Sequence, residues 1–250
     1  NIILGQSGPI SGKASVEYIQ TSVGLALNHS VDAIATAPIN KESIHLAGYT
    51  WPGHTEMLAE FTDTNDVALM LAGDVLRVVI ATTHVPIGNI QQLISCKKIT
   101  TIIQLTHQWL VEHVAESPSI AVTGLNPHCG DGGTFGREEL TEIIPALEIA
   151  QKKGIKVSGP FSADSLFAKL KPNEYDAVIT MYHDQGMIPV KMANRGTSVN
   201  VTIGLPIIRT SVDHGTAFDI AGKNRASPES LKLAIRSAAQ FAKPKSNRLR

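Results

Sequence analysis

The sequence predicts an α/β fold in which strands and helices alternate along the chain. Segments of strand length rich in β-branched residues are separated by segments with the apolar period of a helix. This alternation favours parallel strands joined by crossover helices. No Pro/Gly/Ser-rich linker interrupts the 250 residues. Two lobes with interleaved segments would give this pattern, so residues 1–250 are treated as one two-lobed unit whose internal boundary stays open.

The elements can be predicted in order from their periodicity and end signals. Gly154 is typical of a helix end, and Ser227 with Pro228 is typical of a helix cap followed by the first helical residue. Residues 199–208 form a further strand-like run, closed by Arg209. The other expected elements are a helix over residues 15–28, strands over 31–36 and 78–83, a helix over 100–116, a strand over 120–124, a helix over 137–153, a strand over 176–181 and a helix over 228–242.

Composition excludes several classes of protein. Lysine plus arginine equals aspartate plus glutamate at 22 each, so no overall field attracts nucleic acid. No apolar stretch is long enough to span a bilayer, so no membrane segment is expected. Cys96 and Cys129 form no close pair, which favours a reducing, cytoplasmic compartment. The chain opens inside the apolar run Ile2-Ile3-Leu4 with no leader, so its start looks truncated.

Three histidines each follow an apolar run that is readable as a strand. His84 follows residues 78–83, His128 follows 120–127 and His183 follows 177–182. The carboxyl ends of parallel strands converge on one crevice, where three imidazoles could bind one divalent metal. Singly, each is explained as well or better as a turn residue. Their shared placement favours a metal site, and Asp184 beside His183 could orient that ring or transfer a proton.

A second group of residues suggests an anion site. Pro52-Gly53-His54-Thr55-Glu56 precedes apolar residues at helical spacing, so His54 and Thr55 lie at a helix start, where free N–H groups favour an anion. The alternative is an ordinary helix cap. Lys191, Asn200 and Arg209 follow His183, and the two cations are of the kind that a neutral protein needs for a phosphorylated substrate. Taken alone, Lys191 and Arg209 are each better explained as a surface charge.

Residues 212–224 combine small residues with carboxylates, and small residues let a flat ring or a phosphate approach the backbone closely. The chain contains neither G-x-G-x-x-G nor G-x-x-x-x-G-K-[ST]. A nucleotide would therefore need a site of another kind.

In combination, five motifs resemble the 4-hydroxythreonine-4-phosphate dehydrogenase family of vitamin B6 synthesis. The resemblance covers nearly the whole chain, although the family carries a further N-terminal segment that is missing here. The motifs are Pro52-Gly53-His54-Thr55-Glu56, Ala81-Thr82-Thr83-His84, Gly124-Leu125-Asn126-Pro127-His128, Met181-Tyr182-His183-Asp184-Gln185-Gly186 and Arg209-Thr210-Ser211-Val212-Asp213-His214-Gly215-Thr216-Ala217.

The resemblance implies an isocitrate/isopropylmalate dehydrogenase-like fold, with two α/β lobes, a cleft between them, and a homodimer whose metal site is completed across the interface. It places the metal ligands on His84, His128 and His183. The stretch from His214 to Lys223 resembles the NAD-contacting loop, with His214, Gly215, Ala217 and Asp219 as candidate contacts. The implied substrate contacts are His54, Thr55, Lys191, Asn200 and Arg209.

The implied reaction oxidises the secondary alcohol of 4-phosphooxy-L-threonine with NAD or NADP. The resulting β-keto acid loses carbon dioxide to give 3-amino-2-oxopropyl phosphate. Histidine ligands suit zinc, cobalt or nickel better than magnesium, although open positions could admit several metals, magnesium included. Asp164 and Asp184 are the candidates for proton transfer or for support of the metal ligands.

Three alternatives stay open at this point. A dehydrogenase of threonate or erythronate 4-phosphate would share the metal and phosphate sites. A metal-dependent hydrolase or aldolase would carry out no hydride chemistry, so NAD would not bind the loop from His214 to Lys223. A binding module whose histidines only satisfy turns would bind no stoichiometric metal.

Overall fold

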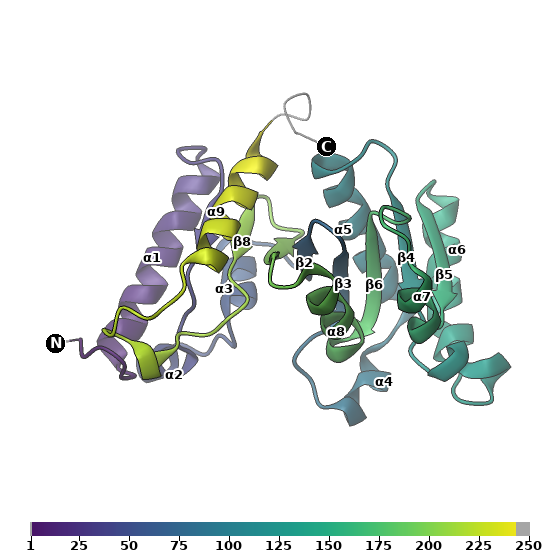
Figure 1. Ribbon diagram of the computed structural model, residues 1–250, viewed down its shortest axis with the longest axis horizontal. Helices are drawn as coiled ribbons and strands as arrows, with labels where there is room; N and C mark the ends of the chain where they lie inside the picture. Colours follow the sequence, from purple (N-terminus) through teal and green to yellow (C-terminus); the bar gives the residue numbers. More distant parts are fainter. Residues whose placement is uncertain (1, 244–250) are drawn as a thin grey trace. The chain divides into compact units, whose positions relative to one another are not determined.

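The structure, a computed structural model, describes residues 2–243 and divides into two compact units (Figure 1). Within the described residues, we call the unit formed by residues 2–67 and 199–243 the terminal unit, and the unit formed by residues 68–198 the central unit. The chain therefore leaves the terminal unit once and returns to it. In Figure 1 the purple and yellow segments, far apart in the sequence, lie together in the terminal unit.

The terminal unit is built on three strands. The edge strand β1 (Ile34–Thr36) pairs in parallel with β8 (Arg209–Ser211), and β8 pairs antiparallel with β7 (Ser198–Ile203). Its helices are α1 (Pro9–Leu27), α2 (Lys41–Leu46), α3 (His54–Phe61), the short η4 (Phe218–Ile220) and α9 (Glu229–Ala242). Apolar side chains of α1, β1, α2 and α3 form one buried cluster, which fixes the start of α3 against the strands.

The central unit contains five strands in the order β2-β3-β6-β4-β5. Only β2 is antiparallel to its neighbour. The strands are β2 (Ala68–Gly73), β3 (Arg77–Thr82), β4 (Ser119–Thr123), β5 (Lys156–Phe161) and β6 (Ala177–Tyr182). The helical segments are η1 (Ile87–Asn89), α4 (Ile90–Leu93), α5 (Cys96–His113), η2 (Pro127–Gly133), the π-helical η3 (Glu139–Ile143), α6 (Ile144–Lys152), α7 (Ala163–Lys169) and α8 (His183–Asn194).

The three histidine-bearing segments follow neighbouring parallel strands. β6 lies between β3 and β4 and is parallel to both, so the carboxyl ends of the three strands lie at one edge of the sheet. His84 follows β3, His183 follows β6 and His128 follows β4. The strand-end placement read from the sequence is confirmed.

The prediction that neighbouring strands are parallel is wrong for two strand pairs. β2 and β3 are antiparallel and are joined by residues 74–76, while β7 and β8 are antiparallel and are joined by residues 204–208. A parallel crossover needs a dozen or more residues, so connections of this length force hairpins. The run 199–208 is consequently not one strand, because the chain turns at Gly204, whose φ of 96° lies in the left-handed region.

Several predicted boundaries also move. α1 begins at Pro9 rather than residue 15, since proline is preorganised for the first helical position. The strand predicted over 31–36 is limited to residues 34–36. The helix predicted over 137–153 begins with a π-helical turn before Pro145, whose missing N–H cannot continue a regular hydrogen-bond ladder. His183 starts α8 directly instead of lying in a loop. The strands β2 and β5 were not predicted.

Within residues 2–243, none of the helices combines the length and the apolar character needed to cross a membrane.

Candidate functional site

Arg209 is a buried cation held by neutral partners. It opens β8 and is only 4% exposed. Its Nε and Nη2 atoms donate to Thr36 Oγ1 at 3.1 and 2.7 Å, and its Nη1 donates to Thr202 Oγ1 at 3.0 Å. Within residues 2–243 no carboxylate forms an ion pair with it. Burial lowers the pKa of Arg209 to about 10, so the guanidinium stays charged at neutral pH although all its described partners are neutral.

His54 lies at the first position of α3, after Gly53, which has no side chain to cap the first turn. Its Nε2 atom is buried and has no hydrogen-bond partner. Burial, and then the charge of Arg209, lower the pKa of His54 to about 3, so the ring is neutral near pH 7. Thr55 follows at the second helical position. The helix start thus combines an unpaired imidazole nitrogen with backbone N–H groups that have no partner within the helix.

Asn200 adds a second buried polar atom without a partner. Its Nδ2 donates to the carbonyl oxygen of Val212 at 2.8 Å, while its Oδ1 makes no hydrogen bond. A buried polar atom left unpaired costs about 1–3 kcal/mol, and such atoms often mark places where a ligand completes the bonding. His54, Asn200 and Arg209 therefore give the terminal unit the chemistry of a site for a polar anion.

Lys191 belongs to the other unit. It lies on α8 of the central unit and is exposed, whereas the other four predicted substrate contacts belong to the terminal unit.

The rings of His84 and His183 lie close together. Their centroids are 5.6 Å apart and their planes are tilted by 44°. The Nδ1–H of His183 donates to Asp184 Oδ1 at 2.7 Å, because a carboxylate can only accept. This bond leaves Nε2 of His183 as the free lone pair, the arrangement that ligand histidines in metal sites adopt.

His128 does not join this pair within one chain. In the described part of the chain no three His, Cys, Asp or Glu side chains are grouped so that they could hold a metal ion. His128 lies in a segment whose residues 128–132 all have positive φ, an unusual backbone for non-glycine residues.

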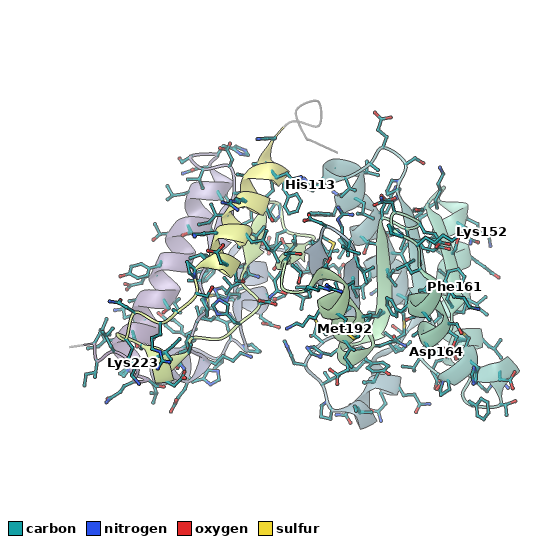
Figure 2. The ribbon with its side chains drawn as sticks, viewed as in Figure 1. His113, Lys152, Phe161, Asp164, Met192 and Lys223 are labelled. Carbon is teal, nitrogen blue, oxygen red and sulfur yellow. The ribbon has the colours of Figure 1, made fainter. Side chains whose placement is uncertain are left out.

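Asp164, labelled in Figure 2, lies at the start of α7 and is exposed. Its pKa is lowered by the hydrogen bond from the Ser162 hydroxyl first, by the N–H of Ser165, and to a lesser extent by the charge of His128. Asp164 is thus an ionised carboxylate within electrostatic reach of His128, which is a poor condition for a general acid.

The candidate NAD loop is an exposed, internally bonded turn. The Nδ1–H of His214 donates to Gly215 O at 2.9 Å, and Ala217 has a left-handed φ of 48° ahead of η4. The Nζ of Lys223, labelled in Figure 2, donates to Asp219 O at 2.7 Å. The loop is therefore held in shape by its own side chains.

The sequence did not identify Thr36 and Thr202, which hold the Arg209 guanidinium. The sequence does contain a signal for Thr202. Asn200 and Thr202 are two residues apart in an apolar strand, so both side chains lie on the same face of β7. Thr36 carries no such signal, because its role depends on the pairing of β1 with β8.

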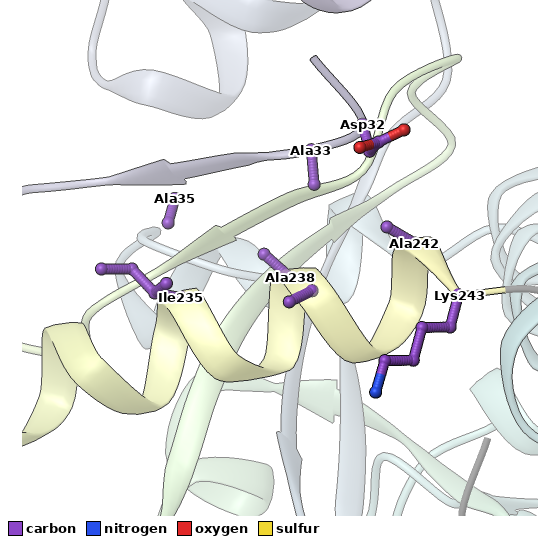
Figure 3. Close-up of a pocket in the computed structure, with 8 residues that line it drawn as sticks. Asp32, Ala33, Ala35, Ile235, Ala238, Ala242 and Lys243 are labelled. Atoms are coloured by element: carbon purple, nitrogen blue, oxygen red, sulfur yellow. The ribbon is translucent and has the colours of Figure 1, made fainter. Parts of the chain in front are cut away.

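A groove of about 480 Å³ lies elsewhere in the terminal unit, between β1 and α9 (Figure 3). Alanines dominate its lining, with Asp32 and Lys243 as its charged residues, and it contains none of the predicted site residues. A ligand site needs convergent polar groups, so this groove is a weaker candidate than the group around Arg209 in the same unit.

Comparison with known proteins assigns the family. The family model described as pyridoxal phosphate biosynthetic protein PdxA matches residues 1–238. The chain belongs to the PdxA family. A 4-hydroxythreonine-4-phosphate dehydrogenase of Trichlorobacter lovleyi is 49% identical over 97% of this chain and 73% of its own length. A D-threonate 4-phosphate dehydrogenase of Cupriavidus necator is 45% identical over 95% of this chain and 72% of its own length.

Solved structures agree with the family and the fold. The crystal structure of 4-hydroxythreonine-4-phosphate dehydrogenase from Klebsiella pneumoniae matches with a TM-score of 0.90 and 42% identity, over 96% of this chain and 73% of that one. A β-decarboxylating dehydrogenase from Thermococcus kodakarensis matches with a TM-score of 0.54 at 17% identity, covering 90% of this chain and 67% of that one, which shows the fold alone. This PdxA-family chain is a dehydrogenase with an isocitrate/isopropylmalate dehydrogenase-like α/β fold, as the sequence predicted.

Proposed function

We propose that this chain oxidises and decarboxylates 4-phosphooxy-L-threonine with NAD or NADP and a divalent metal, in the synthesis of pyridoxal phosphate. Membership of the PdxA family supports the reaction class. The observation that carries the proposal is Arg209, a buried cation with no carboxylate partner among residues 2–243, in a unit where His54 and Asn200 keep buried polar atoms unpaired. A small, phosphorylated hydroxy acid supplies both the anion and the polar groups that this site lacks.

Residues of the terminal unit hold the substrate in this proposal. Arg209 and the N–H groups at the start of α3 bind an anionic group, His54 donates from Nε2–H, and Thr55 adds a hydroxyl. Asn200 accepts from a substrate hydroxyl or ammonium group at Oδ1. Lys191 contributes a charge from the central unit. Fixing both ends of a small substrate aims its carbinol hydrogen at the nicotinamide.

His84 and His183 provide two of the metal ligands in this proposal, and His128 of the partner subunit provides the third in a homodimer. The close pair of imidazoles fits zinc or cobalt better than magnesium. When bound, the metal would lower the pKa of the substrate hydroxyl and polarise the carbonyl group formed from it. Asp184 fixes the His183 ring through its Nδ1–H, and Asp164 plays the corresponding supporting role near His128.

The exposed loop from His214 to Lys223 is the proposed NAD(P) contact, with Gly215, Ala217 and Asp219 nearest to the cofactor. Small residues at this turn leave its backbone open to a flat ring or a phosphate. The cytoplasm stays the predicted location.

Oxidation of D-threonate 4-phosphate is a second candidate, because relatives that are 42–45% identical bear that name. The two substrates differ at one group, an amine or a hydroxyl, and either can donate to the unpaired Oδ1 of Asn200.

The test offers purified enzyme, divalent metal and NAD or NADP with each substrate in parallel. Nicotinamide reduction and carbon dioxide release are followed together, because release of carbon dioxide distinguishes decarboxylation from oxidation alone. We expect reduction with 4-phosphooxy-L-threonine, with at least a tenfold larger kcat/KM than with D-threonate 4-phosphate. The opposite ratio would favour the second candidate, and reduction with neither substrate would refute both.

Two variants make this test specific. Arg209→Met removes the buried cation and should abolish turnover of both substrates. His29→Asn is the control, because His29 is exposed and has a left-handed φ of 60° that asparagine tolerates. Full activity of Arg209→Met would show that the anion binds elsewhere.

A further inference from the structure

Gln185 joins the ends of two strands that precede metal-ligand candidates. Its Oε1 accepts from the N–H of Met181 at 2.7 Å and from the hydroxyl of Thr123 at 2.9 Å. Its Nε2 donates to the carbonyl oxygen of Gly124 at 2.8 Å. Met181 lies on β6 two residues before His183. Thr123 ends β4 and Gly124 follows it, ahead of His128. One side chain thus bonds three groups across the edge of the sheet.

Glu139 anchors the segment that carries His128. This carboxylate is 1% exposed, and its Oε1 accepts from the N–H groups of Leu125 and Asn126, both at 2.7 Å. Its Oε2 accepts from Asn126 Nδ2 at 2.9 Å. The packing here is tight, because a Cβ on Gly124 or on Gly130 would lie 2.9 Å from a Glu139 oxygen. The start of the His128 segment is therefore bound to a buried charge.

Glu138 extends these bonds toward His84. Its Oε2 accepts from Asn126 Nδ2 at 2.6 Å, and its Oε1 accepts a short hydrogen bond from Gln91 Nε2. Gln91 lies on α4, in the segment that follows β3 and His84. Hydrogen bonds of Glu138, Glu139 and Gln185 consequently connect all three histidine-bearing segments.

We propose that Glu139 and Gln185 are positioning residues for the metal site. Within each chain they fix the β4 end that carries His128, which completes the partner's site, and the β6 end that carries His183. Within residues 2–243, their side chains bond backbone groups and the side chains of Thr123 and Asn126, and neither bonds a histidine ring. They act on the backbone from which the rings extend. The proposal rests on the metal site of the proposed function.

The physical reason is the backbone of the His128 segment. Residues 128–132 all have positive φ, and non-glycine residues in this region keep it only where surrounding bonds impose it. Glu139 supplies such bonds at the start of the segment, and they are strong because an ionised acceptor roughly doubles the strength of a hydrogen bond. Without them, His128 would no longer be fixed on its own chain and could not be held in place for the partner's metal site.

The test compares Glu139→Gln and Gln185→Glu with matched controls. Glu139→Gln replaces one accepting oxygen with a donor, which opposes the donors of Asn126. Gln185→Glu keeps acceptors for Met181 but loses the donor to Gly124. The controls are Glu142→Gln and Gln151→Glu. Glu142 accepts from the N–H of Cys96 at 2.7 Å, and Gln151 donates to Val157 O at 3.0 Å, so both make similar bonds away from the histidine segments.

The first measurement is a titration of each full-length variant with Co²⁺, in which the visible absorption of bound Co²⁺ reports binding. We expect the two positioning variants to weaken Co²⁺ binding about 10–100-fold, to alter the absorption spectrum, and to recover part of their kcat at excess metal. The controls should match the wild-type protein in Co²⁺ affinity, in absorption spectrum and in kcat. Equal Co²⁺ affinity and equal spectra in all five proteins would overturn the proposal.

The second measurement is hydrogen exchange without metal, which separates this proposal from the proposed function. Exchange at Leu125 and Asn126 should be at least tenfold faster in Glu139→Gln than in Glu142→Gln. If the wild-type protein bound no Co²⁺, the metal-dependent function would be refuted, and with it the role of these bonds at a metal. If Co²⁺ bound but exchange were equal in both variants, the anchoring role alone would be refuted.

Discussion

Burial of the His54 ring and, after it, the charge of the buried Arg209 guanidinium lower the pKa of His54 to about 3. His54 begins α3 and Arg209 begins β8, so the two meet only because the terminal unit brings distant segments together. This relationship couples the stability of the protein to pH.

Stability should decrease as the pH falls below neutrality. Unfolded His54 takes up a proton near pH 6.5, whereas folded His54 resists protonation until about pH 3. The contribution is therefore present above pH 6.5 and is lost as the pH falls toward 3. Between pH 7 and pH 5 the free energy of unfolding should fall by about 2 kcal/mol from this residue.

Urea unfolding of the wild-type protein and of His54→Gln at pH 7 and pH 5 measures this dependence. The variant should lose less stability over this interval, while the control His29→Asn should behave as the wild-type protein does. Equal pH dependence of His54→Gln and the wild-type protein would contradict the buried, neutral state of His54.

Arg209→Met should abolish anion binding without lowering the stability of the ligand-free protein. A methionine removes a buried cation whose desolvation is costly, so without ligand the melting temperature should not fall. The stabilisation that phosphate gives the wild-type protein, about 2.7 kcal/mol at a concentration 100 times the Kd, should disappear.

Thermal unfolding with and without inorganic phosphate checks this expectation. Lys13→Met is the control, because Lys13 is an exposed residue whose only described ion pair joins it to Glu17 within α1. Undiminished stabilisation of Arg209→Met by phosphate would place the anion away from Arg209.

His183→Ala should remove bound metal and turnover while leaving the fold intact, since the ring lies at the strand edge and outside the apolar cores. Metal content by elemental analysis and far-ultraviolet circular dichroism test the two parts. Asp184→Asn should lower metal affinity by about 10–100-fold, because the carboxylate fixes the ring through Nδ1. Full metal occupancy in His183→Ala would show that His183 is not a ligand.

Two glycines of α1 should respond oppositely to alanine. A Cβ on Gly12 would lie 1.9 Å from the carbonyl oxygen of Ser43, so Gly12→Ala must push α2 away and should destabilise the fold by about 1–3 kcal/mol or more. Gly24 has nothing within 4 Å of its added Cβ, so Gly24→Ala should stabilise the helix by about 0.5–1 kcal/mol. Chemical denaturation of both variants compares them, and equal effects would contradict the close contact of α1 with α2.

The sequence predicted the elements whose signals are local. Apolar runs placed β3, β4 and β6, and the residues that follow these runs placed His84, His128 and His183 at strand ends. The missed elements depend on partners elsewhere in the chain. β5 is partly exposed and contains Gly159 and Pro160, so its strand character comes from pairing with β4.

The sequence by itself determined the α/β class, the position of the histidines after their strands, and the motifs that characterise the family. These features depend only on the periodicity of the apolar residues and on the order of the motifs along the chain. Tertiary structure alone decided that Thr36 and Thr202 hold Arg209, because hydrogen bonds between strands depend on pairing. It also decided that His54 is neutral, since a pKa depends on the burial and charge that folding creates around a ring.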